Sequence, residues 1–381
     1  MEADDLQDWR APDLETMAAK MGVAPAVLQL EIEHIGRSPD FPYLGFVFGK
    51  APKIIYLDTL HWVALAKARL GRPAQQEDAD AYEFLRQAAT SGDIVVPISA
   101  TTFMEISRIK SLRQRSDLSD VIGKISGFVT LVDATIAKDH QIELALAKRL
   151  DGEQPPALRT LGIGVGFAFG KRGGIRMLGL SEDTISDAAR QQVRLFEARA
   201  TAIVDYLALR GPTPEEIPDL RKNGYRPESA WEMESNRLER QLDLATRLGD
   251  EPKYKSKLHD IVAARELYWE VSDRLPRALE RYGMTPSEFY ARGREWLIDF
   301  VNDVPSAAIG TALHERNFRN SYKRWTGNDI RDIDSMIEAV PYCDYVLTDK
   351  HVAAQLAKSA VGRNLGTKIF ARIRDLMAEL T

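Results

Sequence analysis

The chain has 381 residues, of which 44% are hydrophobic and 28% are charged, a balance ordinary for a globular protein with a large core. Its formal net charge of −5 excludes a uniformly basic surface, so nucleic-acid binding would depend on local basic patches. A single cysteine excludes an internal disulfide, and six scattered histidines without ligand spacing argue against a zinc site.

Targeting signals are not evident. No apolar run approaches the roughly 20 residues needed to span a bilayer. The acidic N-terminus, Met-Glu-Ala-Asp-Asp, lacks the apolar core of a signal peptide. We therefore expect a cytoplasmic protein without a membrane partner.

Residues 1–50 are predicted to form a separate N-terminal helical segment. The stretch from Met17 to Val27 has the rhythm of a helix-turn-helix. Its second helix would continue with Glu31 and Glu33, and acidic side chains there repel DNA phosphates. The pattern therefore favours a plain helical hairpin or a partner-docking element, followed by a linker at 38–42.

An α/β domain is predicted in two parts, 51–180 and 311–381. The expected strands are Lys53–Asp58, Asp93–Ile98, Val129–Val132, Tyr345–Thr348 and Thr367–Phe370, with helical stretches between them. Such alternation indicates a parallel sheet covered by helices on both faces. Residues 181–310, between the two parts, are charged and show helical periodicity without strand signals, which predicts a helical insertion.

Two of these strands run directly into an aspartate. Ile54–Leu57 precedes Asp58, and Tyr345–Thr348 precedes Asp349. Open α/β sheets bind ligands at the edge where parallel strands end, so both carboxylates are expected there. The structural alternative for each aspartate is a helix N-cap.

Glu105 lies on the predicted helix that follows the second strand, on the same face as Ile109 and Leu112. A carboxylate on a core-facing surface needs an arginine, a hydrogen bond or a metal. The structural alternative is an ion pair with Arg108, one turn away.

A helix predicted over Asn328–Val340 carries two more candidate acids. Asp329 falls inside its apolar arc and Asp332 lies at the edge of that arc. The opposite side, predicted to face solvent, carries Arg331, Asp334 and Glu338. Acids favour the first helical turn, but two acids on the core side exceed what capping requires. Either Asp332 or Asp329 is therefore a candidate metal ligand.

Acids that converge at one sheet edge repel one another unless a hard divalent cation lies among them. Basic side chains beside such a site would contact substrate phosphates, and the candidates are Arg108, Lys110, Lys171 and Arg172. The last two belong to a stretch, 162–174, with six glycines. It matches neither common glycine-rich phosphate motif and is predicted to be a flexible loop.

Four of these pieces together resemble a PIN-like nuclease domain. They are Ile55–Thr59, Val96–Ser99 leading to Glu105, Asn328–Asp332 and Tyr342–Asp349. The resemblance covers about 51–135 and 325–381, in the family's order, and implies a three-layer α/β fold with a central parallel sheet. Two positions depart from the family pattern: Leu60 replaces a frequent Asn or Ser, and Lys350 holds the usual place of the last acid.

Members of this family use three or four carboxylates to hold Mg²⁺ or Mn²⁺ and hydrolyse phosphodiesters, usually of RNA. The resemblance implies catalytic and ligand roles for Asp58, Glu105, Asp332 or Asp329, and Asp349, with the hydroxyls of Thr59 and Thr348 beside them. The expected activity is that of a Mg²⁺- or Mn²⁺-dependent endoribonuclease acting on an RNA substrate, as a toxin or defence effector would. A protein inhibitor, another protein partner and a homo-oligomer are all compatible with it.

Two alternatives stay open. A non-catalytic PIN-like scaffold would bind RNA or protein without cutting, which the Lys350 departure would suit. A structure-specific DNA nuclease would use the same acids on another substrate.

Overall fold

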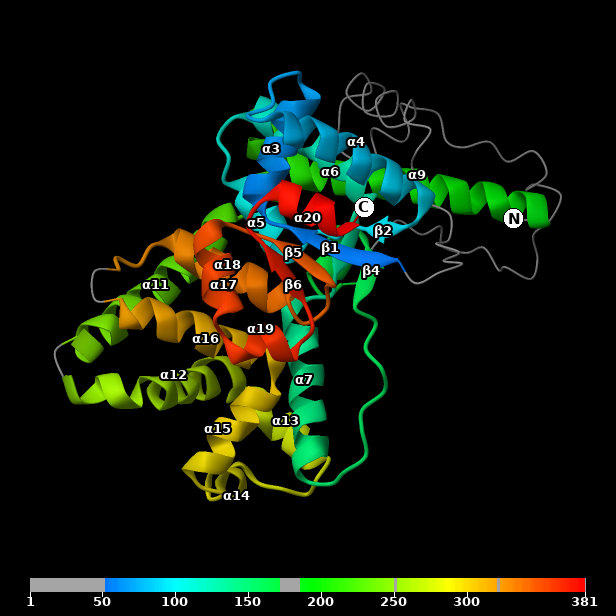
Figure 1. Cartoon of the computed structure of the whole chain (residues 1–381). Coiled ribbons are helices and arrows are strands. Elements are labelled where there is room, and N and C mark those ends of the chain that lie inside the picture. The colour runs from blue at the N-terminus through cyan, green and yellow to red at the C-terminus, as the bar shows by residue number, and fades with distance from the viewer. Residues whose placement is uncertain (1–51, 172–185, 250–251, 321–322, 381) are drawn as a thin grey trace.

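Four strands form a parallel sheet in the order β2-β1-β5-β6 (Figure 1). Their bounds are Lys53–Leu57 for β1, Ile94–Val95 for β2, Tyr345–Leu347 for β5 and Lys368–Phe370 for β6. The structure is a computed structural model that describes residues 52–171, 186–249, 252–320 and 323–380. The predicted N-terminal segment, 1–50, lies outside the described residues.

The sheet is buried on both faces because its strands alternate between two apolar cores. Ile55 and Leu57 point into one core, whereas Tyr56 and Val346 point into the other. The first core is built with side chains of α3 (Thr59–Arg69), α4 (Gln76–Ser91), α5 (Ala100–Ser107), α6 (Leu112–Ser126) and α20 (Ile373–Leu380). The second is built with α16 (Pro305–Arg319), α17 (Gly327–Ala339) and α18 (Lys350–Ala357). The chain is thus a mixed α/β protein with helices on both sides of a parallel sheet.

The third predicted strand exists but does not extend this sheet. It is β3 (Val129–Leu131), which pairs antiparallel with β4 (Leu161–Ile163). A single bridge from Ile98 to Thr130 connects it to the end of the β2 segment.

The glycine-rich stretch is ordered as far as it is described, so the prediction of a flexible loop is wrong there. It forms β4 and the short helix α8 (Gly164–Ala168). The ring of Phe167 lies where a Cβ on Gly162 would be, 2.3 Å from the ring atom Cγ. Gly164 has a φ of +87° and lies against Asp205, whose carboxylate accepts from the amide of Val165 at 2.9 Å. The glycines therefore permit close packing, which composition alone does not reveal.

Between β4 and β5, every described element is a helix. After α8 come four α-helices, one 3₁₀-helix (η2) and one π-helix (η3): α9 (Asp187–Arg210), α10 (Ile217–Lys222), α11 (Pro227–Gly249), η2 (Pro252–Lys257), α12 (Leu258–Glu266) and η3 (Leu267–Val271). Then come α13 (Leu275–Glu280), α14 (Pro286–Tyr290) and α15 (Arg294–Asp303).

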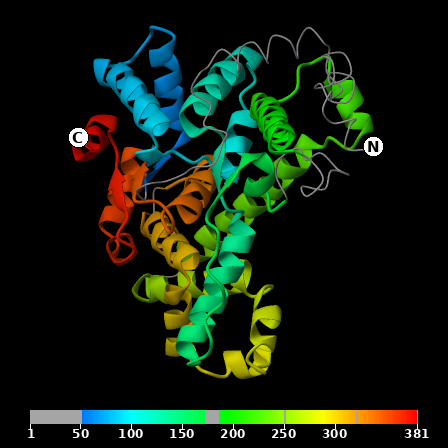
Figure 2. The same ribbon diagram turned by 90° about the vertical axis from the view of Figure 1, so that its right-hand side faces the viewer.

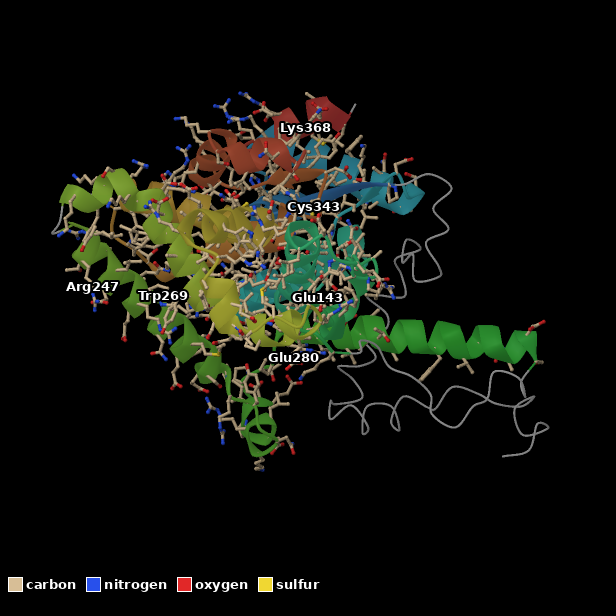
Figure 3. All side chains as sticks on the ribbon, turned by 90° about the horizontal axis from the view of Figure 1, so that it is seen from below. Glu143, Arg247, Trp269, Glu280, Cys343 and Lys368 are labelled. Carbon is tan, nitrogen blue, oxygen red and sulfur yellow. The ribbon has the colours of Figure 1, made fainter. Side chains whose placement is uncertain are left out.

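The later helices of this block have a core of their own, shared with α7 (Ala134–Arg149). Figures 1 and 2 both show α13, α14 and α15 gathered at the end of α7 that lies away from the sheet. Seen from below, Glu143 of α7 and Glu280 of α13 lie near each other (Figure 3), and the next residue, Arg281, binds Glu143 at 2.5 Å. The block meets the α/β part through α11 against α17 and α12 against α16.

Candidate metal centre

Asp58 and Asp349 lie at one edge of the sheet because they follow neighbouring parallel strands, β1 and β5. Each also caps the helix that comes next: Asp58 accepts from the amide of Thr59 at 2.6 Å, and Asp349 accepts from that of His351 at 2.6 Å. In both cases the cap uses Oδ1 alone. The second oxygen of Asp349 therefore takes no part in the cap, and that of Asp58 accepts only from the hydroxyl of Thr348 at 3.0 Å.

Asp332 completes a cluster of three carboxylates. It lies on the second turn of α17, and one oxygen each from Asp58, Asp332 and Asp349 lie within 4.8 Å of one another. The three residues come from β1, α17 and the β5–α18 junction. Asp332 is half-buried and forms no ion pair or hydrogen bond with any described residue, which leaves its charge without a protein partner.

The acids raise one another's pKa values. Burial, followed by the charge of Glu105, raises the pKa of Asp58 to about 6. Burial, followed by the charges of Asp58 and Asp349, raises the pKa of Asp332 to about 7. The physical cause is the same in both cases, because each ionised carboxylate is poorly hydrated and has like charges around it. A bound cation would lower both pKa values, because its positive charge favours the ionised carboxylates.

Glu105 lies beside the three acids and is held by two protein groups. The hydroxyl of Thr59 donates to its Oε2, and Nε of Arg331 is 3.4 Å from its Oε1. Burial raises the pKa of Glu105, while Thr59 and Arg331 act to lower it. Its expected partner Arg108 instead binds Glu234 at 2.7 Å.

The prediction that one side of α17 faces solvent is wrong, because other helices cover that side. Arg331 reaches Glu105 and also binds Glu234 of α11 at 2.6 Å. Asp334 is paired with Arg237 of α11 at 2.6 Å. The reason is tertiary, because α11 packs against α17 from a distant part of the sequence.

Glu338, on the same side of α17, is 7% exposed and faces α5. Its Oε2 accepts from the amide of Thr101 at 3.3 Å. Burial raises its pKa to about 7. No local signal in the sequence separates it from an ordinary surface glutamate.

Asp329 performs the capping role that its position in the first turn suggests. It closes a capping box with Thr326, accepting from the Thr326 amide at 2.8 Å, and it binds Lys323. Both of its oxygens are therefore engaged. Of the two candidates on this helix, Asp332 lies with the other acids, whereas Asp329 caps the N-terminus of the helix.

The predicted substrate-binding residues divide into two groups. The hydroxyls of Thr59 and Thr348 lie in the site, where Thr348 donates to Asp58 Oδ2 at 3.0 Å. Arg108 is neutralised by Glu234, whereas Lys110 and Lys171 are exposed. Arg172 lies outside the described residues.

Three residues near the acids were not predicted from the sequence to belong to the site: His61, Glu234 and Arg331. His61, three residues after Asp58, is buried, and its Nε2 lies 3.2 Å from the carbonyl of Thr348. Burial lowers the pKa of His61. Its place in the first turn after Asp58 could have identified it, whereas nothing local points to Glu234 or Arg331.

The three carboxylates fit a divalent cation. Opposite ligands of Mg²⁺ lie about 4.2 Å apart and those of Ca²⁺ about 5 Å apart, so the 4.8 Å limit of the cluster spans the range of one shared ion. The ligand set contains only carboxylate oxygens, which suits Mg²⁺, Mn²⁺ or Ca²⁺ rather than zinc.

Within the part of the chain that the structure describes, no helix is long and apolar enough to cross a membrane. Comparisons with protein-family models, with curated proteins and with solved structures found no match for this chain.

Proposed function

We propose that this protein is a divalent-metal-dependent endonuclease with a PIN-like domain, and that its substrate is RNA. The observation that carries the proposal is the convergence of Asp58, Asp332 and Asp349 at the edge where parallel strands end. Unpaired carboxylates are costly to bring together, and a phosphodiester hydrolase is a common function for which such a cluster is needed. The order of the acids along the chain agrees with the PIN-like pattern.

Asp58, Asp332 and Asp349 would hold the cation. When bound, it would supply Lewis-acid activation of the phosphate and of the attacking water. The hydroxyl of Thr348 orients Asp58, and that of Thr59 orients Glu105. No Ser or Cys nucleophile is required.

Glu105 and Arg331 set the charge of the site. Glu105 adds a fourth carboxylate, whose charge acts on Asp58. Arg331 offsets part of that charge from the side of α17. Lys350, exposed at the first position of α18 beside Asp349, would contact a phosphate, since an ammonium group cannot bind a cation.

The test is incubation of the purified protein with total RNA in Mn²⁺ or Mg²⁺, with and without EDTA. Cleavage should require the cation and should fall at least about a hundredfold in Asp332→Asn, because a lost ligand removes transition-state stabilisation. Asp80→Asn, an exposed aspartate of α4, is the matched control and should cleave like the wild type.

A parallel series with single-stranded, flap and duplex DNA determines the substrate class. Faster cleavage of a DNA structure than of RNA would assign the site to DNA. A protein that binds Mn²⁺ but cuts none of these substrates would be a PIN-like scaffold, and the proposed enzyme function would be wrong.

A further inference from the structure

A cavity lined by both charged and apolar residues lies between the helical block and the α/β part. Its volume is about 550 Å³, and its lining includes His259, Thr311, Glu315, Arg316, Lys358 and Asn364. These residues come from α12, from α16, from the end of α18 and from α19 (Ala360–Asn364), and α16 packs against both α18 and α19 (Figure 1). Cavities of about 300–1,000 Å³ are typical of small-molecule sites.

The cavity is locally basic on a chain with a formal net charge of −5. Its one carboxylate, Glu315, is occupied by His259 at 2.9 Å and by Arg319 at 2.6 Å. Arg316 and Lys358 form no ion pair and no hydrogen bond with any described residue. Two unpaired cations therefore face a cavity whose carboxylate is already neutralised, which favours an anionic ligand.

Thr311 provides an independent sign of a polar ligand. Its side chain lines the cavity and is 1% exposed, yet its hydroxyl has no hydrogen-bond partner. A buried hydroxyl without a partner is uncommon and unfavourable. A ligand oxygen in the cavity would supply the missing bond.

We propose that this cavity binds a phosphate monoester of about the size of a mononucleotide. Arg316 and Lys358 would contact the phosphate, and the hydroxyl of Thr311 would bond a polar atom of the ligand. The apolar part of the ligand would pack against side chains such as Ala312 and Leu365, which also line the cavity. Inorganic phosphate alone would leave most of the volume unfilled.

The cavity is distinct from the acidic cluster. Asp349 is the N-cap of helix α18 and Lys358 is its C-cap, so about 13 Å of helix separates the two. A bound nucleoside monophosphate has two sources: a free nucleotide, or the phosphorylated end of a nucleic-acid strand. The chemistry recognised is the same in both cases.

The test is calorimetric titration of the full chain in EDTA with adenosine 5′-monophosphate, adenosine and inorganic phosphate. The monophosphate should bind saturably, phosphate more weakly and adenosine not measurably. The double variant R316Q/K358Q should bind the monophosphate at least about tenfold more weakly, because charge-assisted hydrogen bonds are lost. Thr311→Val should weaken binding as well, without a change of charge.

Two controls separate this proposal from the nuclease assignment. Arg277→Gln, an exposed arginine outside the cavity lining, should bind like the wild type. Asp58→Asn should also leave the affinity unchanged, whatever its effect on cleavage. Equal affinity in the wild type and R316Q/K358Q, with both folded by circular dichroism, would overturn the proposal, as would the absence of saturable binding.

The source is decided with two RNA oligonucleotides that differ only in a 5′-phosphate. Tighter binding of the phosphorylated strand, lost in R316Q/K358Q, identifies a strand end as the ligand. Equal binding of the two strands together with tight binding of the free monophosphate identifies a free nucleotide. If neither ligand depends on Arg316 and Lys358, the cavity is not a phosphate site.

Discussion

Arg331 of α17 and Glu234 of α11 form an ion pair of 2.6 Å, and the same guanidinium lies 3.4 Å from Glu105. This arrangement joins the helical block to the acidic site through a single side chain. It also places one positive charge next to a group of carboxylates. The helical block therefore contributes to the electrostatic field at the acidic site.

Replacing Arg331 by methionine should tighten Mn²⁺ binding. The positive charge that competes with a cation at Glu105 is then gone, and a gain of about three- to tenfold in affinity is expected for a partly screened charge at this distance. The free energy of unfolding should fall by about 1–3 kcal/mol because Glu105 and Glu234 each lose a partner. Calorimetric titration with Mn²⁺ measures the first effect and urea unfolding the second. Arg331→Lys, which keeps the charge, is the control, and weaker Mn²⁺ binding in the methionine variant would contradict the electrostatic account.

Asp58→Asn should melt at the same temperature as the wild type, or higher, in EDTA at pH 8. The folded-state pKa of Asp58 is raised to about 6 from 3.8, so the folded protein favours the protonated form. Stability is lost as pH rises through 6, by roughly 3 kcal/mol in all. The amide removes this penalty, and Asn is as good an N-cap as Asp.

The same variant should gain less stability from added Mn²⁺ than the wild type. Binding of Mn²⁺ to the folded state stabilises it by mass action, and the variant lacks one of the carboxylates that would hold the ion. Thermal melts with and without Mn²⁺ measure both effects. Strong destabilisation of Asp58→Asn in EDTA would mean that Asp58 is a structural cap and no more.

Asp329→Asn and Asp332→Asn should have opposite phenotypes. Asp329 holds Thr326 and Lys323 at the start of α17, so its amide should lower the free energy of unfolding by about 1 kcal/mol and leave Mn²⁺ affinity nearly unchanged. Asp332 has no protein partner among the described residues and its pKa is raised to about 7, so without metal its amide should be at least as stable as the wild type at neutral pH, and it should weaken Mn²⁺ binding at least about tenfold. Urea unfolding and Mn²⁺ titration of both variants test this. Equal loss of Mn²⁺ affinity in the two would assign both acids to the metal.

Glu338→Gln should become more stable than the wild type as pH rises. The pKa of Glu338 is raised to about 7 from 4.5, so its contribution is fully present below the unfolded value and is lost as pH rises through 7. The variant has no such titration and keeps an acceptor for the Thr101 amide. The difference in unfolding free energy should grow from near zero at pH 4.5 to about 3 kcal/mol at pH 8. Urea unfolding across this range measures it, with the exposed Glu83→Gln as control; a constant difference would show that Glu338 is ionised in the folded protein.

The positions of Asp58 and Asp349 at the sheet edge could be predicted from local sequence. Each follows a short apolar run whose length and composition are those of a buried strand. Once two such strands are parallel, their ends lie on one edge by geometry. The helix over 328–340 could also be predicted from the sequence, because its apolar residues repeat at helical spacing.

Other features depended on contacts between distant residues. Arg331 and Glu234 are 97 positions apart, and only the packing of α11 on α17 brings them together. The same packing covers the face of α17 that periodicity assigns to solvent, and α5 buries Glu338 on it. Periodicity defines an apolar face of one helix, but a polar face can also be buried wherever a second helix supplies opposite charges.

The sequence by itself determined which acids stand at strand ends and on the core side of a helix, because apolar periodicity encodes local structure. The tertiary structure alone decided that Asp332 rather than Asp329 joins Asp58 and Asp349, and that Glu105 is held by Thr59 and Arg331. Capping and cation binding require the same residue types in the same places, so residue type cannot separate them. The choice depends on where the remaining oxygen of each carboxylate points once the helices have packed.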